Sequence, residues 1–237
     1  MFGAMIDPKA LLDRVLGAGT AERAAGALSS ADQKLSGMGV PGGLAGAAAG
    51  AGILALLVGG KAGKIARYGG AAALGALAYR AWQSWQQGQA APTAPPAPGE
   101  IAATDARFLP HATTGADGQP FALALIRGMI GAAKADGHVD AEESRRIFEA
   151  VERSGLGPEE KAAIFQAMNA PSDPGAIAAA AATPEQAAEL WFAARLAATP
   201  DHPAERAYLD ALAHRLKLDP GLRAALESQA AAAQAGG

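Results

Sequence analysis

The stretch from Leu35 to Gly60, which contains no charged residue, constrains the fold of this chain more than any other feature. Its 26 residues include nine glycines and six alanines. The apolar block Ile53–Val58 lies within it, close to its C-terminal end. Roughly 20 apolar residues are enough to cross a bilayer. Gly42, Gly46 and Gly50 recur at four-residue spacing, which lines up one helix face and allows close helix pairing. We therefore predict a membrane-inserted segment with these three glycines as a membrane or oligomer face.

A basic turn and a group of aromatic residues follow the uncharged stretch. The run from Tyr68 to Tyr79 is again uncharged but is too short to cross a bilayer alone. Residues 35–99 contain four basic and no acidic residues, which favours an anionic lipid surface. Both a helical hairpin and a single span are compatible with this pattern, and a flexible Gly/Ala linker is the alternative for residues 36–43. The predicted interfacial residues are Lys61, Lys64, Arg67, Tyr79, Arg80, Trp82 and Trp85.

The composition excludes several classes of protein. The 237 residues include 65 alanines and 30 glycines but only 12 aromatic residues, so large side chains for a single-core enzyme domain are scarce. The absence of cysteine excludes a disulfide scaffold, an iron–sulfur cluster and a cysteine-ligated zinc site. The net charge of −3 and the lack of a basic stripe argue against nucleic acid as a partner.

The chain divides into four predicted parts, and the expected fold class is all-α. Residues 1–34 form an N-terminal amphipathic segment, in which Asp7 and Pro8 begin a short helix. Residues 35–85 form a Gly/Ala-rich membrane anchor or helical hairpin, and residues 86–120 form a Pro/Ala-rich linker with little fixed structure. Residues 121–237 form a small helical-bundle domain. Its buried central helix covers 121–135, an amphipathic helix covers 140–154, and further helices start at Pro158, Pro184, Pro203 and Pro220.

Two acidic turns are the only groups of residues in the sequence that suggest a metal-binding or catalytic site. Residues 136–143 match the second half of a calcium loop, but Ala132 and Lys134 stand where its first two carboxylates belong. The alternative is that Asp140 and Glu143 cap the following helix. A second acidic turn precedes the helix at Pro203. If the two turns meet in space, they provide a site for a divalent cation, Ca²⁺ or Mg²⁺, whose candidate ligands are Asp136, Asp140, Glu143, Asp201 and Glu205.

Several segments together resemble a known family. They are residues 7–13, the Gly/Ala-rich stretch, Leu74–Trp82, Ala124–His138 and Asp201–Asp210. The chain is similar to the bacterial inner-membrane family of unknown function 533, the YebE type, and its C-terminal part resembles the tellurite-resistance TerB-like helical domain. The resemblance implies a membrane-associated protein whose acidic turns bind a divalent metal. It implies no established reaction.

The leading functional prediction is a non-enzymatic, membrane-tethered interaction or metal-sensing module, with a role in envelope or metal stress. No catalytic residue is predicted, and the expected partners are membrane lipid, further copies of the chain and an unidentified protein. One alternative is a metal-dependent enzyme that uses the acidic turns with His138 or His202. The other is a soluble helical protein with peripheral lipid binding. The expected location is the bacterial inner membrane, with the helical domain in the cytoplasm by the positive-inside rule for a single span. A hairpin with its basic turn inside would reverse this orientation.

Overall fold

The computed structural model describes residues 7–16, 71–110, 112–135, 145, 148–149, 151, 157–198 and 202–235. This part of the chain contains nine α-helices, one short 3-10 helix and a single isolated bridge between Thr114 and Pro120, and no sheet. The predicted all-α class is therefore confirmed for the described residues. The elements are α1 (Pro8–Leu16), α5 (Ala71–Gln86), α6 (Pro98–Ala102), η2 (Ala106–Phe108), α7 (Phe121–Ala133), α9 (Pro158–Asn169), α10 (Pro174–Ala178), α11 (Pro184–Ala197), α12 (Pro203–Arg215) and α13 (Pro220–Ala235).

Proline residues begin most of these helices. Proline has a fixed φ and no backbone N–H, and both properties suit the first helical position. Side chains then cap the free N–H groups: Thr183 Oγ1 accepts from the Gln186 N–H at 3.2 Å, and Asp219 Oδ1 accepts from the Gly221 N–H at 2.8 Å. The predicted helix starts are confirmed at Pro158, Pro184, Pro203 and Pro220.

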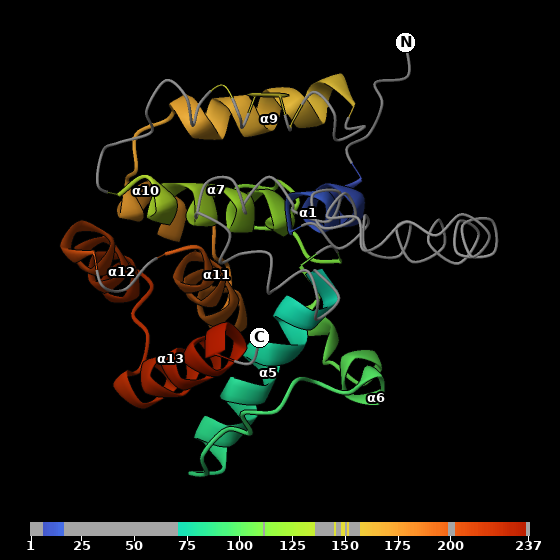
Figure 1. Cartoon of the computed structure of the whole chain (residues 1–237), viewed down its shortest axis with the longest axis vertical. Coiled ribbons are helices and arrows are strands. Elements are labelled where there is room, and N and C mark those ends of the chain that lie inside the picture. Colours follow the sequence, from blue (N-terminus) through green and yellow to red (C-terminus); the bar gives the residue numbers. More distant parts are fainter. Residues whose placement is uncertain are drawn as a thin grey trace, which may run out of the picture.

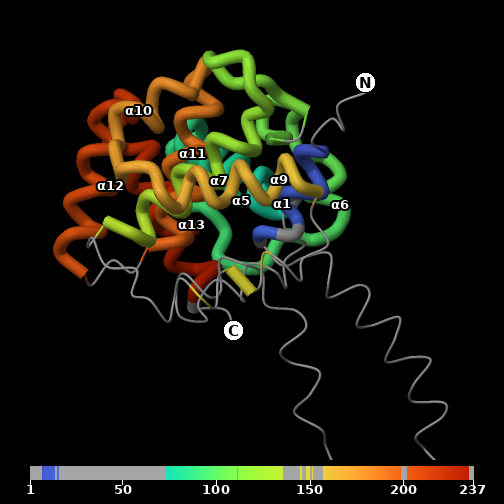
Figure 2. The backbone as a smooth tube through the Cα atoms, turned by 90° about the horizontal axis from the view of Figure 1, so that it is seen from above, coloured from blue at the N-terminus to red at the C-terminus, as the bar shows by residue number. Residues whose placement is uncertain are grey.

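Helix α11 is the centre of the fold, as Figure 1 shows. Every residue from Gln186 to Ala197 is buried, because α11 is surrounded by α7, α5, α13 and α12. Its largest side chains, Trp191 and Phe192, are completely buried. In Figure 1, α7 lies above α11 and α9 lies above α7, while α5 and α13 lie below. Figure 2 shows from above how α9 covers α7.

Glycines on α7 allow its neighbours to approach closely. A Cβ atom on Gly131 would lie 2.5 Å from the hydroxyl oxygen of Tyr208 on α12 and 2.9 Å from Ile177 Cδ1 on α10. Helix α7 is buried nearly all round, with Phe121 fully buried at its start, as its almost uncharged sequence predicts.

Helix α5 belongs to the same body, although its residues were assigned by sequence to the membrane anchor. Leu74, Leu77 and Trp82 are buried in the common core, where α5 packs against α11 and α13. A Cβ on Gly75 would lie 1.9 Å from the Phe108 carbonyl oxygen, so glycine is required for this contact. An alanine-rich apolar helix suits a protein core as well as a lipid core, and hydropathy alone does not separate the two environments.

Residues 86–120 also differ from the expected linker with little fixed structure. They contain α6 and η2, and the Phe108 side chain is completely buried. Its ring lies 5.3 Å from that of Tyr79 and 5.8 Å from that of Trp82, measured between centroids. Phe108 therefore fixes this segment to α5, and proline content alone did not reveal the contact.

The predicted N-terminal helix is confirmed as α1. Asp7 Oδ1 accepts from the backbone N–H groups of Lys9 and Ala10, both at 3.0 Å, and Leu11 and Leu12 are fully buried. Helix α1 packs against both α7 and α5. It is therefore a part of the helical body.

None of the helices in the described residues combines the length and the apolar character needed to cross a membrane. The uncharged stretch 35–60 lies outside the described residues.

Candidate functional site

The candidate site is a cavity of about 380 Å³ between α7, the C-terminal end of α9 and α10. Seven of its thirteen lining residues are alanine or glycine, including Ala124 and Gly131 of α7 and Ala167 and Ala170 at the end of α9. The cavity exists because these side chains are too small to fill the space between the three helices. Its volume lies within the range of small-ligand sites, roughly 300–1,000 Å³.

Charged side chains lie at the edge of this cavity. Arg127 Nη1 lies 3.6 Å from Asp117 Oδ2, and both side chains are about 40% exposed. Asp173 caps α10, where its Oδ1 accepts from the Gly175 N–H at 2.8 Å. The cavity is thus apolar inside, with one guanidinium and two carboxylates in its wall.

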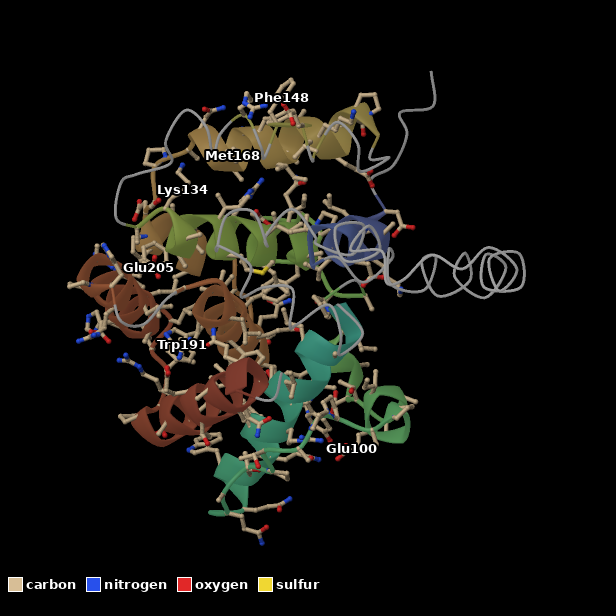
Figure 3. The ribbon with its side chains drawn as sticks, viewed as in Figure 1. Glu100, Lys134, Phe148, Met168, Trp191 and Glu205 are labelled. Carbon is tan, nitrogen blue, oxygen red and sulfur yellow. The ribbon has the colours of Figure 1, made fainter. Side chains whose placement is uncertain are left out.

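Lys134 joins α7 to the end of α9 beside this cavity, and Figure 3 shows it opposite Met168. Its Nζ donates to the Ala170 carbonyl at 3.0 Å and to the Met168 carbonyl. These carbonyls are at the C-terminal end of α9, where a positive charge is favourable. Partial burial lowers the pKa of Lys134. The lysine that interrupts the calcium-loop pattern therefore has a structural role, since it supplies the positive charge that these carbonyl oxygens bind.

The Tyr208 hydroxyl is a buried polar group without a hydrogen-bond partner among the described residues. The residue is 6% exposed, and its oxygen lies against Gly131 and close to Ile177, two residues of the cavity wall. Burial, together with the nearby charge of Asp173, raises the pKa of Tyr208, so the hydroxyl keeps its proton. Within the described part of the chain it is a hydrogen-bond donor without an acceptor, and it lies next to the cavity.

Glu189 is the other residue with a buried polar group that lacks a partner in the part of the chain that the structure describes. It is 0% exposed, and neither of its carboxyl oxygens has a hydrogen-bond partner among the described residues. Its Oε1 lies 3.3 Å from the position that a Cβ on Gly75 would occupy, at the contact between α11 and α5. Burial raises the pKa of Glu189 well above 4.5.

Of the five predicted metal ligands, the structure describes Glu205 alone. Glu205, which is labelled in Figure 3, lies in the first turn of α12. Its exposed fraction is 8%. The described part of the chain contains no group of three or more histidine, aspartate or glutamate side chains placed to hold a metal ion. Asp136, Asp140, Glu143 and Asp201 lie outside the described residues, so whether the two acidic turns meet is left as a prediction.

The predicted membrane-facing residues fall into two groups. Gly42, Gly46, Gly50, Lys61, Lys64 and Arg67 lie outside the described residues. The remaining four, on α5, have partners within the helical body. Arg80 Nη2 lies 2.6 Å from Glu100 Oε2 and Nη1 donates to the Ala94 carbonyl at 2.5 Å, Tyr79 and Trp82 contact Phe108, and Trp85 Nε1 donates to Asp219 Oδ1 at 3.0 Å.

Sequence reasoning did not identify the residues of the cavity. Arg127 and Asp117 are separated by ten positions and belong to no recognised motif. Tyr208 lies on the helix that begins at Pro203, where nothing in the sequence marks it as a binding residue. The one available signal was Asp173 followed by Pro174, an N-cap and a first helical residue that mark the start of the short helix α10.

Comparison with known proteins places the chain in a family. The model for DUF533, described as a protein of unknown function, matches residues 43–230, and the chain belongs to this family. A curated relative from Yersinia enterocolitica, named "Uncharacterized protein in ampR 5'region", is 32% identical over 103 residues. The aligned region covers 44% of this chain and 74% of that relative. No solved structure matches.

Proposed function

We propose that the protein is a non-enzymatic binding module that is attached to one face of a membrane through the uncharged stretch 35–60. The observation that supports this proposal is the position of α1 and α5, which flank residues 17–70 and contact each other within the same body. Both ends of that segment therefore lie on the same side of any membrane that the segment enters. A single crossing of the bilayer would separate α1 from α5.

The length of the stretch supports attachment from one face. Two full crossings need roughly 40 apolar residues, whereas residues 35–60 provide 26. Residues 17–34 carry four charged side chains and do not extend the apolar stretch. A segment that enters and leaves the bilayer by the same face is consistent with the length of the uncharged stretch. It is also consistent with the contact between α1 and α5.

The basic residues support a cytoplasmic helical body. Lys61, Lys64 and Arg67 lie between the uncharged stretch and α5, on the side where the chain rejoins the body. Positively charged segments beside the membrane are retained in the cytoplasm, and they attract anionic lipids. The body is then held at the inner face of the bacterial inner membrane.

The cavity between α7, α9 and α10 is the proposed binding site of this module. Its apolar wall of small residues, the unpartnered Tyr208 hydroxyl and the Arg127–Asp117 pair suit an apolar group that carries a hydrogen-bond acceptor. The TerB-like character of the domain, the divalent-cation role of the acidic turns and self-association through Gly42, Gly46 and Gly50 are further proposals that rest on the sequence pattern.

Membrane fractionation with an alkaline carbonate wash tests the attachment. The full chain is compared with a deletion of residues 35–70, which leaves α5 in place because α5 is part of the core. We expect the full chain to stay in the washed membrane and the deletion to become soluble. A full chain that washes off would support the peripheral alternative and contradict insertion.

Cysteine labelling tests the one-face topology, and the chain contains no native cysteine. Lys9→Cys on α1 and Ser228→Cys on α13 both introduce an exposed thiol. We expect a membrane-impermeant maleimide to label both positions from the cytoplasmic side in inverted vesicles and neither in intact spheroplasts. Labelling of the two positions from opposite sides would disprove the topology even if the carbonate result holds.

A further inference from the structure

A second hollow lies on another part of the body, where the C-terminal end of α5 meets the start of α11 and the connection between α12 and α13. This groove has a volume of about 440 Å³. Trp82, Ala187 and Leu222 are buried residues of its lining, and Trp85 is half-buried beside them. The two indole rings are 5.3 Å apart between centroids, at an interplanar angle of 66°. The groove therefore offers an aromatic and aliphatic surface to a ligand.

Two cationic side chains, those of Arg215 and Lys217, line the same groove. The side chains of Arg215 and Lys217 are exposed, and neither makes an ion pair or hydrogen bond with the described residues. Arginines elsewhere in the body are paired, as Arg195 is with Glu227 at 2.6 Å. The carboxylate in the groove, Asp219, accepts from the Trp85 indole and from the first N–H groups of α13. Among the described residues, the groove lining therefore carries two cations and one carboxylate, and that carboxylate is bonded to the indole and to α13. Asp173 lies close to Arg215 at the start of α10 but forms no ion pair with it.

The backbone conformation at Lys217 is a separate indication that this groove is a functional site. Its φ is +54°, the only positive value at a non-glycine position among the described residues. The Leu218 N–H donates to the Ala213 carbonyl at 3.1 Å, a helix ending at which glycine is usual because it adopts this conformation without strain. A lysine at this position costs stability, and strained positions of this kind often serve a functional site.

We propose that this groove binds an amphiphilic anion. The apolar body of the ligand lies against Trp82, Trp85 and Leu222, and its anionic group lies between Arg215 and Lys217. A neutral apolar ligand would leave the two charges unused, and a cationic ligand would be repelled by them. This proposal does not depend on membrane attachment, since it rests on the groove alone.

Calorimetric titration tests the proposal with a matched pair of probes. The full chain is titrated in buffer, or in nanodiscs of zwitterionic lipid if it needs lipid to stay in solution, and buffer or empty nanodiscs supply the background. The probes are 1-naphthalenesulfonate and the uncharged 1-naphthalenemethanol, which share the same ring system. We expect the wild-type chain to bind the sulfonate at least about tenfold more tightly than the alcohol, a difference of about 1.4 kcal/mol.

Substitution of the two cations identifies the site. In Arg215→Gln/Lys217→Gln the preference for the sulfonate should disappear, while binding of the alcohol stays unchanged. Both side chains are exposed and unpaired, so the variant should fold normally. The control Arg145→Gln/Lys161→Gln removes the same net charge, and neither residue lines the groove. Lys161 lies on α9, and Arg145 pairs with Glu149 at 2.5 Å. Absence of sulfonate binding, an unchanged preference in the groove variant or an equal loss in the control would overturn the proposal.

Competition distinguishes two sources of the anion. Octanoate represents a free fatty carboxylate, and dihexanoyl-phosphatidylglycerol represents an anionic phospholipid. Displacement of the sulfonate by one of them, and not by uncharged dihexanoyl-phosphatidylcholine, would assign the source. Failure of both anions to displace the probe would contradict an amphiphilic ligand.

Discussion

Replacement of Glu189 by methionine is the sharpest test of the packing between α5 and α11. The carboxyl group is 0% exposed and has no hydrogen-bond partner among the described residues. Methionine has a similar length, an equally good helix propensity and no polar atom that needs a donor. Removing an unsatisfied buried polar group is worth about 1–3 kcal/mol. We expect Glu189→Met to raise the free energy of unfolding by this amount at pH 5, and the midpoint of thermal unfolding by about 2–12 °C.

The pH dependence follows from the raised pKa of Glu189. The unfolded chain releases the proton near pH 4.5, while the folded protein retains it to higher pH. The folded state then binds more protons, so the contribution of Glu189 to stability is greatest below pH 4.5. It falls by about 1.4 kcal/mol per pH unit until the pH reaches the folded-state pKa. The methionine variant lacks this contribution, and its advantage over the wild type should grow as the pH rises.

Urea unfolding of the full chain from pH 5 to pH 8, followed by tryptophan fluorescence, measures both effects. Glu159→Met is the control, because Glu159 is exposed on α9 and undergoes the same substitution. The control should keep the pH slope of the wild type. If Glu189→Met lowers stability at every pH, or if its pH slope equals that of the wild type, the carboxyl group has a partner in solution and the reasoning fails.

Three further substitutions test contacts described above. Gly131→Ala should destabilise the protein by about 1–3 kcal/mol, because its Cβ meets the Tyr208 hydroxyl. Tyr208→Phe should be neutral or stabilising, and it should restore part of the stability lost in Gly131→Ala. Lys134→Met should cost about 1–2 kcal/mol, since the last carbonyls of α9 lose their charged donor. Lys217→Gly should stabilise by about 0.5–1 kcal/mol, because glycine adopts a positive φ without strain.

Chemical unfolding measures all of these variants, and each has an outcome that contradicts its basis. Additive effects in the Gly131→Ala/Tyr208→Phe pair would mean that the hydroxyl is not the clashing atom. An unchanged stability in Lys134→Met would mean that water replaces the ammonium at the α9 carbonyls. A loss of stability in Lys217→Gly would show that the lysine side chain stabilises the fold by itself.

Local signals allowed the helices to be predicted from the sequence. Proline at the first helical position, with a capping residue or an acidic residue nearby, acts within a few residues, so the starts at Pro184 and Pro220 were readable without tertiary information. The buried character of α7 was equally local, because its sequence is apolar on all sides. The packing partners of α5 could not be predicted from the sequence. Its alanine-rich face fits lipid and protein alike, and contacts with α11 and α13 join residues more than 100 positions apart.

The candidate site was predictable only in part, for the same reason. Lys134 was noticed as a departure from a metal-binding loop, but its bonds to the end of α9 depend on a contact across more than 30 residues. The cavity arises from small residues on three helices, and alanine is so frequent in this chain that no single alanine marks a wall. Phe108 was the one signal against a featureless linker, since an isolated aromatic residue among prolines and alanines usually packs somewhere.

The position of α5 in the core also affects how the protein is made. More than 130 residues separate the end of α5 from the start of α13, its neighbour across the core. At a translation rate of roughly 5–20 residues per second, α5 leaves the ribosome roughly 7–27 s before that partner is synthesised. During this interval the face of α5 that the folded protein buries is uncovered. The apolar face of α5 is therefore open to other molecules before the C-terminal helices that cover it exist.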